Sequence, residues 1–201
     1  EAAGLIATKS TADDRAALEL VKKYLGFFPS NAWEVPPTSI DTEGERPLDG
    51  ILEMVPADPR RPYDIRRVIE LVADSGDVLE VQPGFGRSIV TALARVGGDA
   101  VAIVANNPAV KAGAIDSDAA DKAARFRDVV SAFALPVVFL ADNPGVPAGT
   151  PAQQPGIPRT AARICAAQPR ARGPTPHARP RKPPSARTAT AALNRAAGRP
   201  R

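Results

Sequence analysis

Apolar residues recur along the first part of the chain at the spacing of an amphipathic helix. Residues 11–25 combine this spacing with Ser10 or Thr11 as an N-cap, acidic residues in the first turn and Gly26 as a C-cap. The predicted apolar face consists of Ala17, Leu18, Val21, Tyr24 and Leu25. We therefore expect a helix over residues 11–25, and Pro29 prevents its continuation.

Residues 31–62 are rich in Pro, Gly and acidic residues and predict a long connection, with one short ordered piece at Ile51 to Val55. A connection of this length is unusual inside a compact domain. A linker between two larger domains would explain it.

After residue 62 the pattern predicts alternating helices and strands. The expected elements are a helix marked by Ile65, Val68, Ile69 and Val72 and ended by Gly76, a strand over Val78 to Gln82, a helix marked by Ile89, Val90, Leu93 and Val96, a strand over Ala100 to Ala105, a helix from Asp116 to Ala134 and a strand over Val137 to Ala141. The last two strands lack polar alternation, which is typical of strands buried on both faces. The chain is therefore predicted to have an α/β fold.

The turn after the first predicted strand contains Gly84, Phe85 and Gly86 and resembles the start of a dinucleotide-binding fingerprint. Ile89 stands where the third glycine would fall, and no suitably placed acid closes the following strand. Both facts disfavour a nucleotide cofactor. Exposed backbone N–H groups in such a turn can nevertheless hold an oxyanion.

Two similar segments close the apolar strands: Asn106 and Asn107 before a proline, and Asp142 in the sequence Asp-Asn-Pro-Gly. Strand ends are the usual place for ligand contacts in an α/β fold. The same residues are also common in turns, and spacing alone favours a turn. Because both strand ends carry similar segments, we expect a shared edge at which a site could form.

The single cysteine, Cys165, and the single histidine, His177, restrict the possible chemistry. They argue against a disulfide framework, a zinc or iron–sulfur site and a His-centred triad, so no metal is expected. Cys165 has no acid–base partner nearby in the sequence, and His177, between prolines, is expected in a solvated loop. No membrane span or signal peptide is recognisable, which favours a cytoplasmic protein without a membrane partner.

The net charge of +4 averages two unlike parts. Residues 158–201 contain ten Arg, one Lys and no acid, whereas the other 157 residues contain 15 basic and 22 acidic side chains. The tail also holds eight Pro and twelve Ala, so we expect it to be largely disordered. Its arginines could contact phosphates, but it has no aromatic residues to stack on bases, so no nucleic-acid partner is expected.

Several long strings resemble the carboxyltransferase (beta) subunits of biotin-dependent acyl-CoA carboxylases. They are SNAWEVPP, VPADPRRPYDIRRVIELVADSGDVLEVQPGFGRSIVTALARVGG, IVANNPAVKAGAIDSDAADKAARF and LPVVFLADNPGVPAGT. The resemblance covers about residues 5–157. Propionyl-CoA, acetyl-CoA and methylcrotonyl-CoA carboxylases share these motifs, so the acyl-CoA substrate stays open.

The resemblance implies a crotonase-like superhelical fold and a reaction that moves a carboxyl group from carboxybiotin, carried on a partner protein, to an acyl-CoA. In this family backbone N–H groups hold the oxyanions, so no catalytic side chain is expected. The implied partners are a biotin carboxylase or biotin carboxyl carrier subunit and further copies of the chain. The candidate substrate-binding or biotin-binding residues are Phe85, Gly86, Asn106, Asn107, Asp142, Pro144, Gly145 and Gly149.

By the same resemblance, residues 1–30 correspond to the end of an N-terminal carboxyltransferase domain, 31–62 to the linker, and 63–157 to part of the C-terminal domain. The resemblance implies that the first domain, which supplies most acyl-CoA contacts in the family, is absent. The chain is therefore either a fragment of a carboxyltransferase acting on a short acyl-CoA or a non-catalytic remnant, and the remnant is favoured for the chain alone. We also expect aggregation or dependence on a partner, because surfaces that normally pack on the first domain would be exposed.

At Gln153 the family usually has Glu. The family pattern weakens after Gly156 and is lost after Lys182. Pro183 to Ala186 stand where the family has Ala, an aromatic residue and the glycines that form its second, biotin-side oxyanion hole. We hypothesise that the tail from near Lys182 is an out-of-frame translation of a GC-rich gene. Translation of the surrounding DNA in all three frames tests this, and the absence of a family-like continuation would refute it.

Overall fold

The computed structural model describes residues 13–31, 33–39, 48, 50–58, 61–142 and 177–178. Within these residues one sheet has the strand order β1-β2-β3-β4-β5. The strands are β1 (Val78–Val81), β2 (Ile89–Val96), β3 (Asp99–Asn106), β4 (Val137–Leu140) and β5 (His177–Ala178). The β1–β2 and β2–β3 pairs are antiparallel, and the β3–β4 and β4–β5 pairs are parallel. Spatial order follows chain order, unlike the reversed order of a doubly wound nucleotide-binding sheet.

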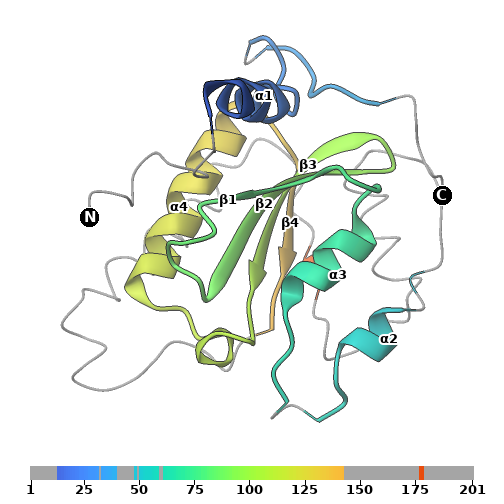
Figure 1. Cartoon of the computed structure of the whole chain (residues 1–201), viewed down its shortest axis with the longest axis vertical. Coiled ribbons are helices and arrows are strands. Elements are labelled where there is room, and N and C mark those ends of the chain that lie inside the picture. Colours follow the sequence, from blue (N-terminus) through green and yellow to red (C-terminus); the bar gives the residue numbers. More distant parts are fainter. Residues whose placement is uncertain are drawn as a thin grey trace.

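Helices cover both faces of this mixed sheet (Figure 1). Helix α4 (Ser117–Ala132) lies on one face, and α3 (Ile65–Val72) lies on the other with α2 (Ile51–Met54) beside it. Helix α1 (Asp14–Leu25) lies on the α4 side, where Tyr24 packs against the core. No helix in the described part of the chain is long and apolar enough to cross a membrane.

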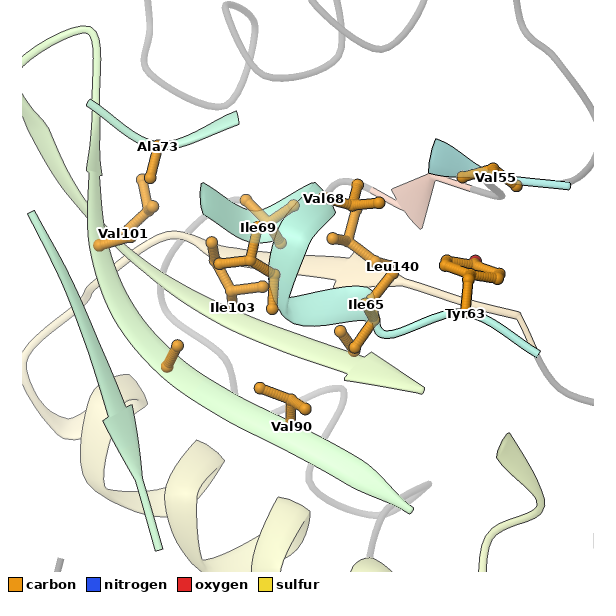
Figure 2. Close-up of a cluster of buried hydrophobic side chains, with 14 residues drawn as sticks. Val55, Tyr63, Ile65, Val68, Ile69, Ala73, Val90, Val101, Ile103 and Leu140 are labelled. Atoms are coloured by element: carbon orange, nitrogen blue, oxygen red, sulfur yellow. The ribbon is translucent and has the colours of Figure 1, made fainter. Parts of the chain in front are cut away.

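Alternation along β2 and β3 divides the core into two clusters. Figure 2 shows the first, in which α3 packs on the sheet face that carries Val90, Val101 and Ile103. The second cluster lies under α4. It contains the side chains that point to the other face of the sheet, such as Leu93, Ala102 and Val104. Both central strands are therefore buried on both faces.

Most of the predicted elements are confirmed. The two apolar strands are β3 and β4, the strand after residue 76 is β1, and the short ordered piece in the long connection is α2. Helix α4 is capped by Asp116, whose carboxylate accepts a hydrogen bond from the Ala119 N–H at 3.0 Å. Its predicted apolar face, with Ala123, Phe126 and Val130, is buried against the sheet.

The helix predicted from Ile89, Val90, Leu93 and Val96 is wrong, because these residues form strand β2. The error has a physical cause. A strand covered on both faces has apolar residues at odd and even positions alike, and some of them then match helical spacing by chance.

Two helix boundaries also differ from the prediction. Helix α1 begins at Asp14, and its N-cap is Asp13, whose carboxylate accepts a hydrogen bond from the Ala16 N–H at 2.7 Å. The predicted caps, Ser10 and Thr11, lie outside the described residues. Helix α3 ends at Val72, and Gly76 instead has a positive φ of 76° in the turn before β1.

Only part of the predicted apolar face of α1 faces the core. No α1 residue is buried, and Leu18, Val21 and Leu25 are 62%, 51% and 59% exposed. The helix contacts the core through Tyr24, a member of the predicted face, and through Leu20, which was not predicted. The strongest apolar stripe of α1 therefore points away from this sheet.

The tail prediction is also corrected at one place. His177, expected in a loop, forms β5 with Ala178 and pairs in parallel with Phe139 of β4. The other residues of 158–201, including Cys165, lie outside the described part of the chain.

Arg95, near the C-terminal end of β2, anchors the segment that follows α1 to the sheet. Its guanidinium donates to the Gly26 carbonyl at 2.8 Å and to the Pro37 carbonyl at 3.1 Å. It also pairs with Asp77 at 3.3 Å and lies 5.4 Å from the centre of the Phe27 ring. One side chain thus joins the end of α1, the following segment and the sheet.

Replacing Leu18, Val21 and Leu25 together by Gln is expected to reduce self-association of the chain, because these side chains are already mostly in water. Sedimentation velocity should show a larger monomer fraction, with unfolding free energy changed by less than ~1 kcal/mol. Leu20→Gln is the matched control and should destabilise the chain, because Leu20 packs on the core. A wild-type chain that is monomeric and melts cooperatively would contradict the expectation.

Candidate functional site at one edge of the sheet

The ends of β1, β3 and β4 and the start of β2 meet at one edge of the sheet. In the register Ile89 of β2 lies opposite Asn106 of β3, and Ala105 of β3 lies opposite Leu140 of β4. The segments after β3 and β4 and the β1–β2 turn therefore leave the sheet side by side. This is the shared edge predicted from the sequence.

The β1–β2 turn, residues 82–88, rests on the first turn of α4. A Cβ placed on Gly86 would lie 2.9 Å from backbone atoms of Ala119 and Asp118, and Gly86 has a φ of +51°. Only glycine satisfies both conditions without strain. Among the described residues, no group accepts a hydrogen bond from the backbone N–H of Gly86 or Arg87. The turn therefore offers unused donors next to a helix N-terminus.

The asparagines after β3 fix the local backbone. The Asn107 N–H donates to the Ser88 carbonyl at 2.9 Å and extends the β2–β3 ladder toward the turn. The Asn106 side-chain amide is buried and donates to the Gly113 carbonyl at 3.0 Å. The Asn107 side-chain oxygen accepts from the Ala109 N–H at 3.2 Å. These contacts match the turn chemistry that the spacing favoured.

Asp142 lies two residues after the end of β4 and accepts a hydrogen bond from a tyrosine on the α3 side of the sheet. The Tyr63 hydroxyl donates to its carboxylate at 2.7 Å. The Asp142 carbonyl oxygen would lie 2.5 Å from a Cβ at Gly113, whose φ is +78°. Gly113 is thus required for the segments after β3 and β4 to approach each other.

Charged groups surround the same edge. Lys111 pairs with Asp116 at 2.5 Å. Burial of Asp116 opposes its ionisation, but hydrogen bonds from Lys111 and the Ala119 N–H hold the pKa of the carboxyl below its ordinary value. On β1, Glu80 accepts two hydrogen bonds from the Arg66 guanidinium, each at 2.8 Å. The charged groups of Lys111, Asp116, Arg66 and Glu80 are therefore each held in an ion pair near the edge.

Lys122 of α4 is fully buried, with 0% of its surface exposed. Its Nζ donates to the Ile89 carbonyl at 2.9 Å. Burial lowers the pKa of this ammonium from 10.5 to about 8, while the charge of Glu80 favours protonation and that of Arg66 opposes it. A buried cation thus lies against the start of β2.

Of the predicted site residues, Phe85, Gly86, Asn106, Asn107 and Asp142 lie at this one edge. The remaining three, Pro144, Gly145 and Gly149, lie outside the described residues. The dinucleotide interpretation loses its structural basis, because the glycine turn joins two antiparallel strands and does not lead into a helix.

Sequence reasoning missed Tyr63 and Lys122. Tyr63 lies in a polar segment before α3 with no periodicity to single it out, and its importance depends on a partner 79 residues away. Lys122 could have been noticed as a charge flanked along its helix by apolar positions 119, 123 and 126. That signal, however, does not indicate its partner.

The sequence pattern of one family covers nearly the whole chain. The model of the carboxyl transferase domain family matches residues 3–189, further than the 5–157 that the resemblance covered. The chain therefore belongs to the carboxyl transferase domain family. Its fold is the crotonase-like α/β fold of these domains, of which the described residues form a part.

Individual relatives agree with this assignment. The chain is 40% identical over 152 residues to the methylmalonyl-CoA carboxyltransferase 12S subunit of Propionibacterium freudenreichii subsp. shermanii, covering 76% of this chain and 29% of that protein. It is 37% identical over 160 residues to the propionyl-CoA carboxylase carboxyltransferase subunit of Haloferax mediterranei, covering 79% and 31%. The chain thus spans about 30% of the length of the curated relatives it matches.

The fold is also found in solved structures. A crystal structure of transcarboxylase 12S, described as a hexamer with hydrolysed methylmalonyl-CoA bound, superimposes with a TM-score of 0.81 at 38% identity. The superposition covers 84% of this chain and 34% of that one. The beta subunit of Pseudomonas aeruginosa geranyl-CoA carboxylase gives a TM-score of 0.62 at 28% identity, covering 82% and 31%.

Gly86→Ala is expected to destabilise the chain by at least ~2 kcal/mol, because the methyl group would meet the α4 backbone at a positive φ. Gly84→Ala is the matched control: nothing lies within 4 Å of its Cβ position, so it should change stability by less than ~0.5 kcal/mol. Urea unfolding of both variants measures the difference. Equal effects would show that the turn does not rest on α4.

The buried Lys122 predicts a pH-dependent stability. Its pKa is lowered on folding, so between pH 8 and 10.5 the unfolded chain binds more protons than the folded chain, and stability rises with pH. Relative to Lys122→Met, the wild type should gain up to ~2 kcal/mol between about pH 7 and pH 9.5. The comparison cancels the titration of other groups. A difference independent of pH would contradict the burial of a charged ammonium.

Proposed function

We propose that this chain forms part of a carboxyltransferase site that moves a carboxyl group from carboxybiotin to a short acyl-CoA such as propionyl-CoA or acetyl-CoA. The support is twofold. The chain belongs to the carboxyl transferase domain family, and relatives named for propionyl-CoA and methylmalonyl-CoA match it over about three quarters of its length.

The observation that carries the proposal is the pair of unused backbone donors in the β1–β2 turn. The N–H groups of Gly86 and Arg87 have no acceptor among the described residues, and Gly86 is fixed against α4. Preorganised donors of this kind stabilise an oxyanion as it develops, at no cost of reorganisation during the reaction. The chemistry therefore needs no catalytic side chain.

The residues at this edge also suit a neutral ligand that gains negative charge on one oxygen, as the thioester carbonyl of an acyl-CoA or the ureido group of biotin does. When bound, carboxybiotin supplies the carboxyl group that is transferred. The Gly86 and Arg87 N–H groups would hold the oxygen, and the half-buried Phe85 would provide apolar contact. Asn106, Asn107 and Asp142 would shape the edge through the backbone contacts that they make.

We further propose the division expected from the family resemblance. Residues 1–30 end an N-terminal domain, 31–62 form the linker, 63–157 belong to the C-terminal domain, and 158–201 form a basic tail. The exposed stripe of α1 supports the first assignment, because a helix docked on a preceding domain would need such a face. The implied partners are a biotin carboxylase or biotin carboxyl carrier subunit and further copies of the chain, in the cytoplasm.

A second candidate is a non-catalytic remnant. The specific observation behind it is length: the matched relatives are about three times longer than the segment they share with this chain. The acyl-CoA contacts that the resemblance assigns to the rest of such a subunit lie outside this shared segment. For the chain alone we favour this alternative.

A transfer assay distinguishes the two candidates. The chain is incubated with methylmalonyl-CoA and free biotin, and the propionyl-CoA formed is measured by chromatography against a reaction without biotin. We expect no turnover by the chain alone, and biotin-dependent turnover after addition of the N-terminal domain of the transcarboxylase 12S subunit. Turnover in either mixture would support the first candidate, and turnover by the chain alone would exclude the remnant. No turnover in either mixture would support the remnant and contradict the first candidate.

A further inference from the structure

One carbonyl at the candidate edge loses its regular partner in the sheet. The β1–β2 register ends with Val81 paired to Thr91, and Gln82, with a φ of 54°, turns the chain away. Pro83 would come opposite Ile89 only if the register continued by two residues. The Ser88 carbonyl accepts from Asn107 on the β3 side, so the polar groups of the next residue, Ile89, face β1. Proline has no N–H to donate. The Ile89 carbonyl would therefore lack a ladder partner where β1 turns away.

A helix side chain takes the place of this missing donor. The Lys122 Nζ reaches the Ile89 carbonyl at 2.9 Å, although the residue is 33 positions away in sequence and fully buried. Leaving a buried carbonyl without a partner is costly, and so is burying an ammonium. The hydrogen bond offsets part of both costs, and it forms only if the start of β2 and α4 keep their mutual position.

The same helix contacts the turn a second time. Gly86 lies against the backbone of Ala119, one turn of α4 before Lys122. The Ile89 N–H in turn donates to the Gly86 carbonyl at 3.0 Å, which links the two contacts through the turn itself. The turn is thus held to α4 on both sides of the unused Arg87 N–H.

We propose that Lys122 is a positioning residue for the β1–β2 turn: by donating to the Ile89 carbonyl, which lies beyond the end of the β1–β2 ladder, it holds the Gly86 and Arg87 N–H groups in place for a ligand oxyanion. The ligand part of this statement rests on the proposed function, whereas the positioning of the turn does not. Lys122 acts through Ile89 and touches no ligand itself.

Hydrogen–deuterium exchange of the full chain, measured by mass spectrometry, tests the positioning. Lys122→Met keeps the length of the side chain and removes the donor. We expect roughly tenfold faster exchange in segments 83–90 and 106–109, as for the loss of a charged hydrogen bond. Segments 65–73 and 97–99, on α3 and at the far edge, should be unchanged. Equal acceleration in all four segments would show a merely structural role and overturn the proposal.

Two further variants make the test specific. Arg125→Met is the control on the same helix, because the Arg125 side chain is 45% exposed and pairs with Asp121 at 2.7 Å. This variant should leave the turn unchanged. Pro83→Ala supplies a backbone N–H at the position that would pair with Ile89 if β1 continued by two residues. In the Lys122→Met background it should therefore let the ladder extend and return exchange of segment 83–90 toward the wild-type rate. A double variant that exchanges as fast as Lys122→Met would overturn the proposal. If Lys122→Met does not fold, recovery of a folded chain by Pro83→Ala supports the proposal, and failure to recover overturns it.

The transfer assay tests the ligand part separately. In the mixture with the 12S N-terminal domain, Lys122→Met should lower kcat at least about tenfold while KM for methylmalonyl-CoA stays within about twofold, because the donors act on the developing oxyanion. An unchanged kcat would overturn this part. If the wild type shows no transfer but the exchange pattern holds, the proposed function fails while the positioning role stands.

Discussion

The pairing of β2 with β3 is the constraint on which the rest of the structure depends. The two strands pair along eight residues each, and side chains on both faces are buried. A shift of one residue would exchange the two faces of each strand and place every side chain in the wrong cluster. The register is therefore strongly specified, and so are the positions at which the strands begin and end.

This fixed register determines what can be built at the edge. Because Ile89 lies opposite Asn106, the turn before β2 and the segment after β3 must leave the sheet together. The side chains in these segments mainly satisfy backbone groups, as Asn106 does for Gly113. What the edge offers to a ligand is consequently backbone, and its precision comes from neighbours in both helical layers, such as Tyr63 and Lys122.

Much of the fold could be predicted from the sequence because local patterns carry it. Asp116 and the apolar face that follows predict α4, and the unbroken apolar run from Ala100 predicts β3. Strand β2 could not be recognised in the same way, since burial on both faces removes the alternation that distinguishes strand from helix. The face of α1 was misjudged for a related reason: amphipathicity shows that Leu18 needs cover but not which part of the protein supplies it.

In the candidate site, too, residues with a local sequence signature could be predicted and residues with long-range contacts could not. Turn residues such as Gly86 and Asn107 have local signatures, so the sequence could suggest them and their common edge. The contacts of Tyr63 with Asp142 and of Lys122 with Ile89 join residues 79 and 33 positions apart. Such contacts depend on the register of the sheet and the placement of the helices, which no local pattern specifies.

The two ends of β2 make different contacts. The candidate site lies at the Ile89 end, and Arg95 lies near the other end. Its guanidinium ties the end of α1 and the segment around Pro37 to the end of the strand that lies away from the candidate site. Eight strand residues span about 26 Å, beyond the distance over which substitutions usually influence one another. Substitutions around Arg95 are therefore not expected to disturb the candidate site at the other end of β2.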